Sequence, residues 1–258
     1  MCIRDRLCMI KNYILSTVFL FFSVLSFSQV SVGNGTLLNE EMPIEPFYKF
    51  SYSQVIYHSG EINASGTITG LKYTASPTTT LENSDGWDIW IGHTSLDQHG
   101  PGDGTTDVSW VDINELTQVF SGNVSILDQV VSITLDTPFE YNGEDNLIIA
   151  VNETSNVNDQ YDSSTHDFYC TATPEVSRGL VSYNDSAGLI DPNNPPNITT
   201  TNLRQSYVNI TFEGITQSCS NPILSLDNLT SNSASISWNA PDVSNFEYVF
   251  QDSHYHQL

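Results

Sequence analysis

The residues of this chain best suited to chemistry are its histidines, because imidazole serves both as a metal ligand and as a general base. Four of the six lie in the main body of the sequence, at His58, His93, His99 and His166. They are far apart and none is spaced i, i+4 from another, so a zinc site would have to be assembled by the fold. The sequence contains no G-x-S-x-G elbow, H-E-x-x-H helix or P-loop. We therefore interpret these histidines as surface or hydrogen-bonded structural residues and predict no catalytic site.

Two cysteines, Cys170 and Cys219, follow the N-terminal leader. In an oxidising exterior they could pair, and such a bridge would add about 4 kcal/mol in the chain-entropy model. The alternative is two separate thiols. A nucleophilic pair of Cys170 with His166 is conceivable, but Phe168 and Tyr169 give this thiol an apolar setting that raises its pKa. The sequence leaves the disulfide open and does not favour a catalytic cysteine.

Two groups of acidic and amide residues could hold calcium, which takes six to eight oxygen ligands from flexible loops. Neither group follows the EF-hand spacing, and acids are so abundant in this chain that chance clusters are expected. We predict no cofactor other than weakly bound, stabilising calcium. The two groups are Asp97, Asp103 and Asp107, and Asn156, Asn158, Asp159, Asp162 and Asp167.

Aromatic residues offer a second route to function, since exposed rings stack on sugar faces or anchor protein partners. Trp87 and Trp90 are separated by an odd number of positions, so on one strand they face opposite sides of a sheet and at least one can be exposed. The alternative for each ring is packing in a core or on a sheet face. The full candidate set is Trp87, Trp90, Trp110, Tyr48, Tyr52 and Tyr57.

Charge excludes several classes of partner. From Gln29 onward the chain has 29 acidic and four basic residues, a formal charge of −25. Nucleic acid binding requires a basic face that releases counterions, and docking to anionic lipid requires the same. An aromatic content of 11% argues against disorder. We therefore expect a folded, acidic protein that binds no nucleic acid.

The N-terminal segment predicts export. We interpret residues 1–8 as a sequencing artefact, because residues 1–6 back-translate to a nucleotide sequence that resembles the mosaic end of a library transposon. Residues 9–28 form a signal peptide, with Lys11 in the positive region, an apolar and hydroxyl stretch over 13–27 and a small-x-small site at 26–28. A spanning helix needs about 20 apolar residues, more than this stretch provides. We expect a secreted or cell-surface protein with no membrane insertion after cleavage.

Short strand-like runs separated by turn residues fill residues 29–216, and no helical period persists. Residues 131–135 alternate strictly, and residues 147–151 are apolar throughout, which predicts a central strand. Asn142-Gly143 between these two runs is a hairpin signal. The pattern predicts an all-β fold, a jelly-roll-like β-sandwich. Further strands are expected at 66–75, 87–93, 168–172, 179–183 and 207–212, with surface loops at 97–107 and 185–201.

A second module is expected after a boundary at residues 214–220. The sequences NPILSLDNLT (221–230) and SASISWNAP (233–241) resemble the opening strands of a fibronectin type III domain. Such a domain needs about seven strands in about 100 residues, so residues 219–258 predict an incomplete one. Trp238 is expected to fill its core, and residues 246–250 to form its third strand.

The larger module resembles the N-terminal module of flavobacterial secreted multidomain proteins, in which it is often followed by fibronectin repeats and a sorting domain for type IX secretion. The resemblance implies a secreted or surface protein and supplies no catalytic residues. It is carried by IEPFYKFSYSQVIY (44–57), EINASGTI (61–68), TLENSDGW (80–87), LTQVFSG (116–122), PFEYNGEDNL (138–147) and DFYC (167–170).

Together these observations predict a non-catalytic binding or adhesion module of a larger secreted protein. Its expected partner is an extracellular glycan or a surface protein. One alternative is an accessory domain of a secreted peptidase or glycoside hydrolase whose catalytic domain lies outside this sequence. A purely structural spacer is another.

Overall fold

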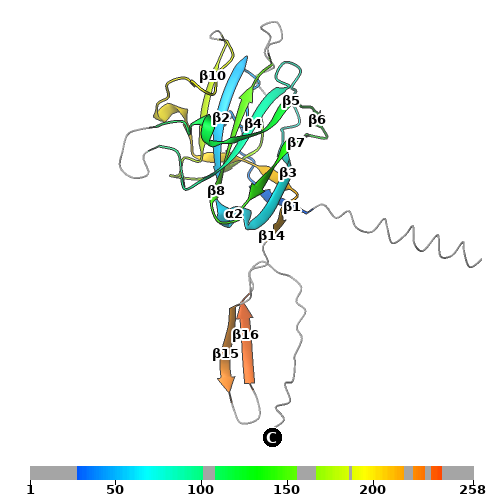
Figure 1. The fold of residues 1–258 in the computed structure, drawn as a ribbon, viewed down its shortest axis with the longest axis vertical. Coiled ribbons are helices and arrows are strands. Elements are labelled where there is room, and N and C mark those ends of the chain that lie inside the picture. Colours follow the sequence, from blue (N-terminus) through cyan, green and yellow to red (C-terminus); the bar gives the residue numbers. More distant parts are fainter. Residues whose placement is uncertain are drawn as a thin grey trace, which may run out of the picture. The chain divides into compact units, whose positions relative to one another are not determined.

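The computed structural model describes residues 28–100, 108–155, 167–185 and 188–217, together with the strands Ile223–Leu229 and Ala234–Asn239. The chain divides into two compact units, Met1–Gln217 and Ser218–Leu258. The first unit is built from antiparallel strands in two main sheets (Figure 1), and the predicted all-β sandwich is confirmed. In the described part of the chain, no helix has both the length and the apolar character needed to cross a membrane. The predicted signal peptide falls almost wholly outside the described residues.

The first sheet has the strand order β1-β13-β3-β7-β6, with β14 also pairing with β3. Its strands are β1 (Gln29–Val32), β13 (Ile210–Glu213), β3 (Ala64–Thr74), β7 (Val130–Tyr141), β6 (Ile126–Leu127) and β14 (Thr216–Gln217). In β7, Val131, Ile133 and Leu135 are buried while Ser132 and Thr134 are exposed, so the predicted alternation is confirmed. This pattern is typical of a strand with one face on the core and one in water.

The second sheet has the strand order β11-β10-β2-β8-β4-β5. Its strands are β11 (Leu203–Arg204), β10 (Gly179–Asn184), β2 (Phe50–Tyr57), β8 (Asn146–Glu153), β4 (Gly86–Thr94) and β5 (Thr117–Asn123). The remaining elements of this unit are β9 (Cys170–Ala172), which pairs with β12 (Ser206–Val208), the helix α2 (Ser59–Ile62) and the 3-10 turns η1 (Ile113–Glu115) and η2 (Thr200–Asn202). Residues 147–151 lie in β8 between β2 and β4, which confirms the predicted central strand.

The main core lies between the two sheets. Trp87, Tyr57 and Tyr73 are fully buried there, together with Phe168 and Phe212. The rings of Trp87 and Phe168 meet edge to face, with centroids 6.0 Å apart. Such large buried aromatic rings supply much of the hydrophobic stabilisation of a core. This core closes the sandwich and leaves the opposite face of each sheet to be covered or solvated.

The hairpin predicted at Asn142-Gly143 is wrong. β7 and β8 follow one another across this turn but belong to different sheets, so they do not pair. The Asn142 side-chain oxygen accepts hydrogen bonds from the backbone N–H groups of Glu144 and Asp145, at 2.9 and 3.1 Å. The Tyr141 hydroxyl donates to the Asp145 carbonyl. These contacts make a wider Asx turn, which carries the chain over from one sheet to the other.

The strand predicted over residues 207–212 is interrupted at Asn209. Its first half is β12, paired with β9, and its second half is β13 in the first sheet. Val208, Ile210 and Phe212 are all buried, as predicted. The chain therefore keeps its inward alternation while it changes pairing partner.

The second unit contains β15 (Ile223–Leu229) and β16 (Ala234–Asn239), which pair in antiparallel fashion with a register shift between Leu226 and Asn228. Strands were predicted at both places. The predicted third strand at 246–250 and the side chain of Trp238 lie outside the description. The fibronectin type III resemblance of this unit stays a prediction.

Candidate functional site

The outer face of the second sheet carries the candidate site. Backbone pairing places Leu180, Gln54, Ala150, Trp90 and Gln118 in one row across β10, β2, β8, β4 and β5. Cross-strand partners of an antiparallel sheet share a face, so all five side chains point away from the main core. The first three are fully buried, Trp90 is partly buried and Gln118 is exposed. The burial of side chains on this outer face therefore decreases from β10 towards β5.

A second hydrophobic cluster forms the cover. Phe50, Tyr52 and Ala150 of the sheet pack with Ile113 and Ile190 from two loop segments. Trp90, Trp110 and Leu116 are partly buried against this cluster. The Trp110 ring lies on Tyr52, with centroids 4.8 Å apart at 44°. Burial raises the pKa of the Tyr52 hydroxyl to about 12, so this ring stays neutral under Trp110.

Side-chain hydrogen bonds join the two loop segments to the sheet and to each other. Gln54 pairs with Val111 in both directions: its amide N–H donates to the Val111 carbonyl at 2.8 Å and its oxygen accepts from the Val111 N–H at 2.9 Å. Asn152 donates to the carbonyl of Ile190. The Trp110 indole N–H donates to the carbonyl of Pro196 at 3.0 Å. Both loops are therefore held by buried polar groups as well as by apolar contact.

An open pocket of about 340 Å³ adjoins this cluster, lined in part by Asn184, Leu189, Ile190, Asp191, Asn194 and Pro196. Ile190 belongs to both the pocket and the outer cluster, and Pro196 is the residue bonded to Trp110. Leu189 is 49% exposed. We call the surface formed by Trp90, Trp110, Leu116 and this pocket the aromatic face. It combines partly exposed rings with amide and carboxylate groups, the usual lining of sites that take sugars or protein side chains.

The structure separates the candidate aromatic residues into two groups. Trp87 has no exposed surface, and its indole N–H donates to the Ser84 carbonyl at 2.8 Å, so it is a core residue. Trp87 and Trp90 lie in different clusters on opposite sides of the sheet, as their spacing predicted. Tyr57 is buried, and its hydroxyl donates to the carbonyl of Val208. Tyr48 is partly buried and stacks on Tyr183 with centroids 4.1 Å apart.

His58 makes two hydrogen bonds through its ring. Its Nδ1 lies 3.0 Å from an Arg178 guanidinium nitrogen and its Nε2 lies 2.8 Å from the Asp97 carbonyl oxygen. A guanidinium only donates, so Nδ1 accepts and Nε2 carries the proton. Arg178 is buried, donates to the Ile56 carbonyl and pairs with Glu61 at 2.8 Å. Both ring nitrogens of His58 are therefore hydrogen-bonded.

Two further histidines, His93 and His99, are described. His93 is exposed, accepts a hydrogen bond from the Asn142 N–H at 3.2 Å and stacks on Tyr141. His99 is 2% exposed, and neither ring nitrogen has a hydrogen-bond partner among the described residues. Burial lowers the pKa of His99 to about 4, nearby Arg178 lowers it further, and the Gln54 backbone opposes the shift. His166 lies outside the described residues.

The predicted calcium ligands are only partly described. The Asp97 carboxylate accepts a hydrogen bond from the Asn146 amide at 3.1 Å, and the Asp167 backbone bonds with Thr79. The other predicted ligands lie outside the described residues: Asp103, Asp107, Asn156, Asn158, Asp159 and Asp162. Within the described ranges, no group of three or more His, Cys, Asp or Glu residues is placed to hold a metal ion. Weak calcium binding stays a prediction.

Cys170 is buried and forms no disulfide with another described residue, and its Sγ lies 3.7 Å from the Phe168 carbonyl oxygen. Burial raises its pKa well above the usual value, which agrees with the apolar setting expected from the sequence. A thiol that stays protonated is a poor nucleophile. Cys219 and His166 lie outside the described residues, so neither the disulfide nor the nucleophilic pair is tested.

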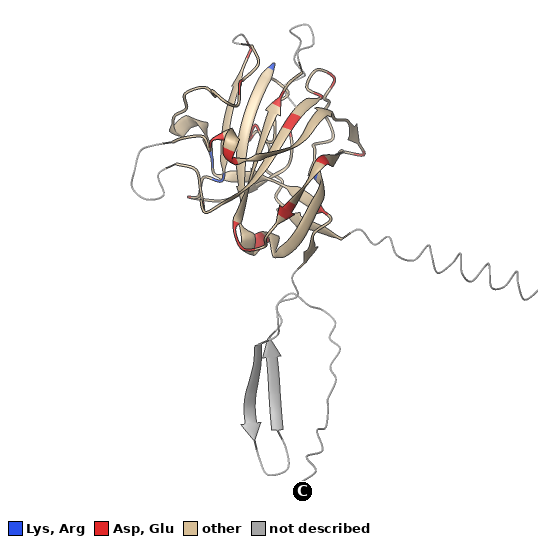
Figure 2. Cartoon of the chain, viewed as in Figure 1, with Lys and Arg blue, Asp and Glu red and all other residues tan. Residues whose placement is uncertain are grey.

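Acidic residues are scattered over the strands and loops of the first unit and outnumber the basic residues (Figure 2). Three of the four basic residues after Gln29 are paired with glutamates: Lys72 with Glu213 at 2.6 Å, Arg178 with Glu61 at 2.8 Å and Arg204 with Glu41 at 2.6 Å. A polyanion such as nucleic acid would have to bind these same basic side chains, and the glutamates already neutralise them.

Comparison with known proteins adds no relative to this picture. No family model matches the chain, and neither a curated protein nor a solved structure matches it. The argument for function therefore depends on the geometry of the aromatic face.

Proposed function

We propose that this chain is a non-catalytic binding module of a larger secreted or cell-surface protein, and that the aromatic face is its binding surface. Its partner is an extracellular glycan or a surface protein. The observation that carries the proposal is the pair of partly exposed indole rings, Trp90 and Trp110, packed on a buried cluster that holds them in place.

Such rings are suited to binding for two reasons. A tryptophan with only two side-chain torsions loses little conformational entropy when it contacts a partner. The tilted packing of Trp110 on Tyr52 and its hydrogen bond to Pro196 restrict it further before any partner arrives. Preorganisation of this kind raises affinity because less order has to be created on binding.

The proposal includes that the protein is exported and that it does not bind nucleic acid. The N-terminal leader pattern supports export, and the net charge of −25 from Gln29 onward supports a partner that is neutral or basic. The resemblance of the second unit to a fibronectin type III domain fits a multidomain surface protein. The leader, the charge and the resemblance are all sequence evidence.

The test is retention of the protein on immobilised extracellular glycans and on intact cell surfaces, compared with Trp90→Ala and Trp110→Ala. Residues at the centre of a binding surface commonly contribute 2 kcal/mol or more, so we expect each variant to bind at least about tenfold more weakly. Leu127→Ala is the matched control, because Leu127 is a 75% exposed apolar residue of the first sheet. Equal retention of all four proteins would remove the aromatic face from consideration, and no retention on any surface would favour a spacer.

A further inference from the structure

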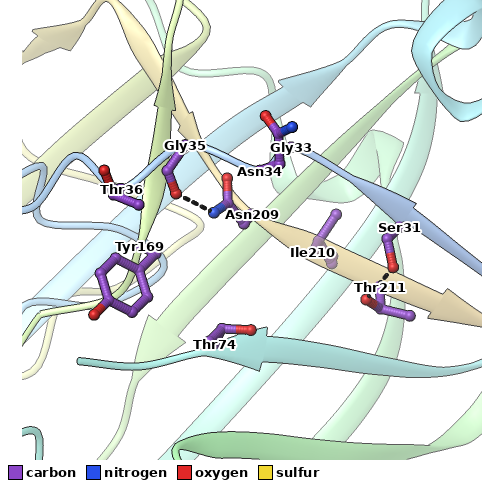
Figure 3. Close-up of a pocket in the computed structure, with 10 residues that line it drawn as sticks. All are labelled: Ser31, Gly33, Asn34, Gly35, Thr36, Thr74, Tyr169, Asn209, Ile210 and Thr211. Atoms are coloured by element: carbon purple, nitrogen blue, oxygen red, sulfur yellow. Dashed lines mark hydrogen bonds between the residues drawn. The ribbon is translucent and has the colours of Figure 1, made fainter. Parts of the chain in front are cut away.

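A second pocket lies on the first sheet, where residues 33–36 pass the break between β12 and β13 (Figure 3). Its volume is about 300 Å³, at the lower end of the range of ligand pockets. None of its ten lining residues is charged. This is notable in a chain with 29 acidic residues after Gln29, and it indicates that the pocket surface differs in kind from its surroundings.

The floor of the pocket is fixed by a compact set of hydrogen bonds. The Thr171 hydroxyl accepts from the backbone N–H groups of Asn34 and Gly35, at 3.1 and 2.8 Å, and its own proton goes to the Asn209 side-chain oxygen at 2.7 Å. The Asn209 amide N–H donates to the Gly35 carbonyl at 2.8 Å. Figure 3 shows this last bond at the centre of the pocket. The break in the strand at Asn209 thus serves to anchor the loop.

The loop of residues 33–36 comes so close to β9 that it needs glycine. A Cβ atom at Gly35 would lie 2.4 Å from the Cys170 carbonyl oxygen, which is a backbone atom that cannot move aside. Gly33 has a φ of +87°, in the region that favours glycine. Leu37 then pairs with Cys170 through two backbone hydrogen bonds of 3.1 and 2.8 Å. The loop is therefore held against β9 from both sides and the pocket is preformed.

Four lining side chains keep their hydrogen-bonding capacity for a ligand. The Asn34 amide and the hydroxyls of Thr36, Thr74 and Tyr169 have no side-chain hydrogen bond within the described residues. By contrast, Ser31 and Thr211 bond each other through their hydroxyls at 2.8 Å. Figure 3 places Tyr169 and Thr36 on one side of Asn209 and the Ser31–Thr211 pair on the other. The open groups include both donors and acceptors, and Tyr169 adds a ring face.

We propose that this pocket binds a neutral sugar unit. An anion would be repelled by the field of the protein, and a cation would find no carboxylate in the lining. A purely apolar ligand would leave the hydroxyls and the amide without partners, which costs binding energy. A neutral polyhydroxyl ring satisfies these groups and presents an apolar face to Tyr169. The volume accommodates one or two rings, and the site is independent of the aromatic face.

The experiment is a titration of the full chain with glucose, galactose, mannose and their β-linked disaccharides, followed by saturation-transfer NMR and calorimetry. We expect at least one neutral sugar to bind, and Asn34→Ala and Tyr169→Phe each to bind it about tenfold more weakly. Thr36→Ala is expected to weaken binding as well, while its matched control Thr200→Ala, a change of another exposed threonine hydroxyl in η2, leaves binding unchanged. Glucuronate should bind more weakly than glucose, because its carboxylate is repelled.

The two proposed sites are distinguished by crossing the variants. Sugar binding that persists in Trp90→Ala and Trp110→Ala but falls in Asn34→Ala supports the pocket. Binding that falls in the tryptophan variants and persists in Asn34→Ala and Tyr169→Phe would overturn the pocket and support the aromatic face. No binding of any neutral sugar to the unaltered chain, with the fold intact by circular dichroism, would also overturn it.

Discussion

Both faces of the second sheet carry tryptophan, but the tryptophans differ in burial and in what holds them. On the inner face Trp87 is fully buried and its indole N–H is satisfied by Ser84, three residues earlier in the chain. On the outer face Trp90 and Trp110 are only partly buried, and Trp110 is held by Pro196, 86 residues away. The comparison teaches that the inner cluster closes the fold, whereas the outer cluster is a smaller platform that leaves aromatic surface available.

The largest expected effect separates the two tryptophans of β4. Trp87→Ala should lower the free energy of unfolding by about 3 to 5 kcal/mol, because it opens a cavity in the main core. Trp90→Ala should cost only about 1 kcal/mol, because part of its ring is already in water. Chemical denaturation of both variants measures the difference. Equal losses would mean that the outer cluster is a second structural core and would break the comparison.

A second pair, His99 and His93, contrasts a buried with an exposed imidazole. The pKa of His99 is lowered from 6.5 to about 4. As the pH falls, His99 is therefore protonated in the unfolded chain before it is protonated in the folded protein. The stability that comes from keeping His99 neutral is fully present above about pH 6.5 and is lost as the pH falls to about 4, by up to about 3 kcal/mol. His99→Leu should flatten this part of the pH dependence of the unfolding free energy, measured by denaturation between pH 4 and 7.

The control for this prediction is His93→Leu, which should leave the loss of stability in acid intact. Glu45 contributes with the opposite sign, because burial raises its pKa to about 7. Its contribution to stability is present below about pH 4.5 and is lost as the pH rises through about 7. The difference between each variant and the unaltered chain therefore isolates His99 better than the shape of one curve. Identical curves for His99→Leu and the unaltered chain would contradict the assignment.

The smallest expected effect compares two glutamines of the same row. Gln54→Ala removes both hydrogen bonds that fix Val111, and we expect a loss of about 2 kcal/mol together with faster proteolysis of residues 108–116. Gln118→Ala, on the exposed end of the row, should change stability by less than about 0.5 kcal/mol. Thermal unfolding and limited proteolysis measure both. Unchanged proteolysis in Gln54→Ala would show that apolar contact alone holds this loop.

The sequence predicted those parts of the fold that depend on the local pattern of apolar residues. Residues 131–135 and 147–151 form the strands expected of them, and the odd spacing of Trp87 and Trp90 predicted their opposite faces. β2 was not predicted as a strand, because Ser51, Ser53 and Gln54 interrupt its apolar pattern although all three are buried. Ser51 bonds Glu153 of β8, Ser53 bonds the Pro43 carbonyl and Gln54 bonds Val111, and periodicity cannot reveal such partners.

Long-range partners explain the remaining differences. The Asn142-Gly143 pair predicts a turn but not which sheet receives the next strand, and the Asx contacts of Asn142 decide that. The aromatic face depends on Gln54 and Pro196 reaching across more than 50 positions each. The proline-rich character of residues 185–201 marked a surface loop, yet gave no sign that Ile190 packs on the sheet. The candidate aromatic residues could therefore be predicted from the sequence, but which of them lie together on the aromatic face could not.

The most direct test of the aromatic face is oxidative footprinting of the tryptophans, with mass spectrometry, in the presence and absence of a glycan or cell surface that retains the protein. The account predicts that oxidation of Trp90 and Trp110 falls on binding, while Trp87 stays unreactive in both states. Unchanged oxidation of Trp90 and Trp110 in the bound protein would contradict it.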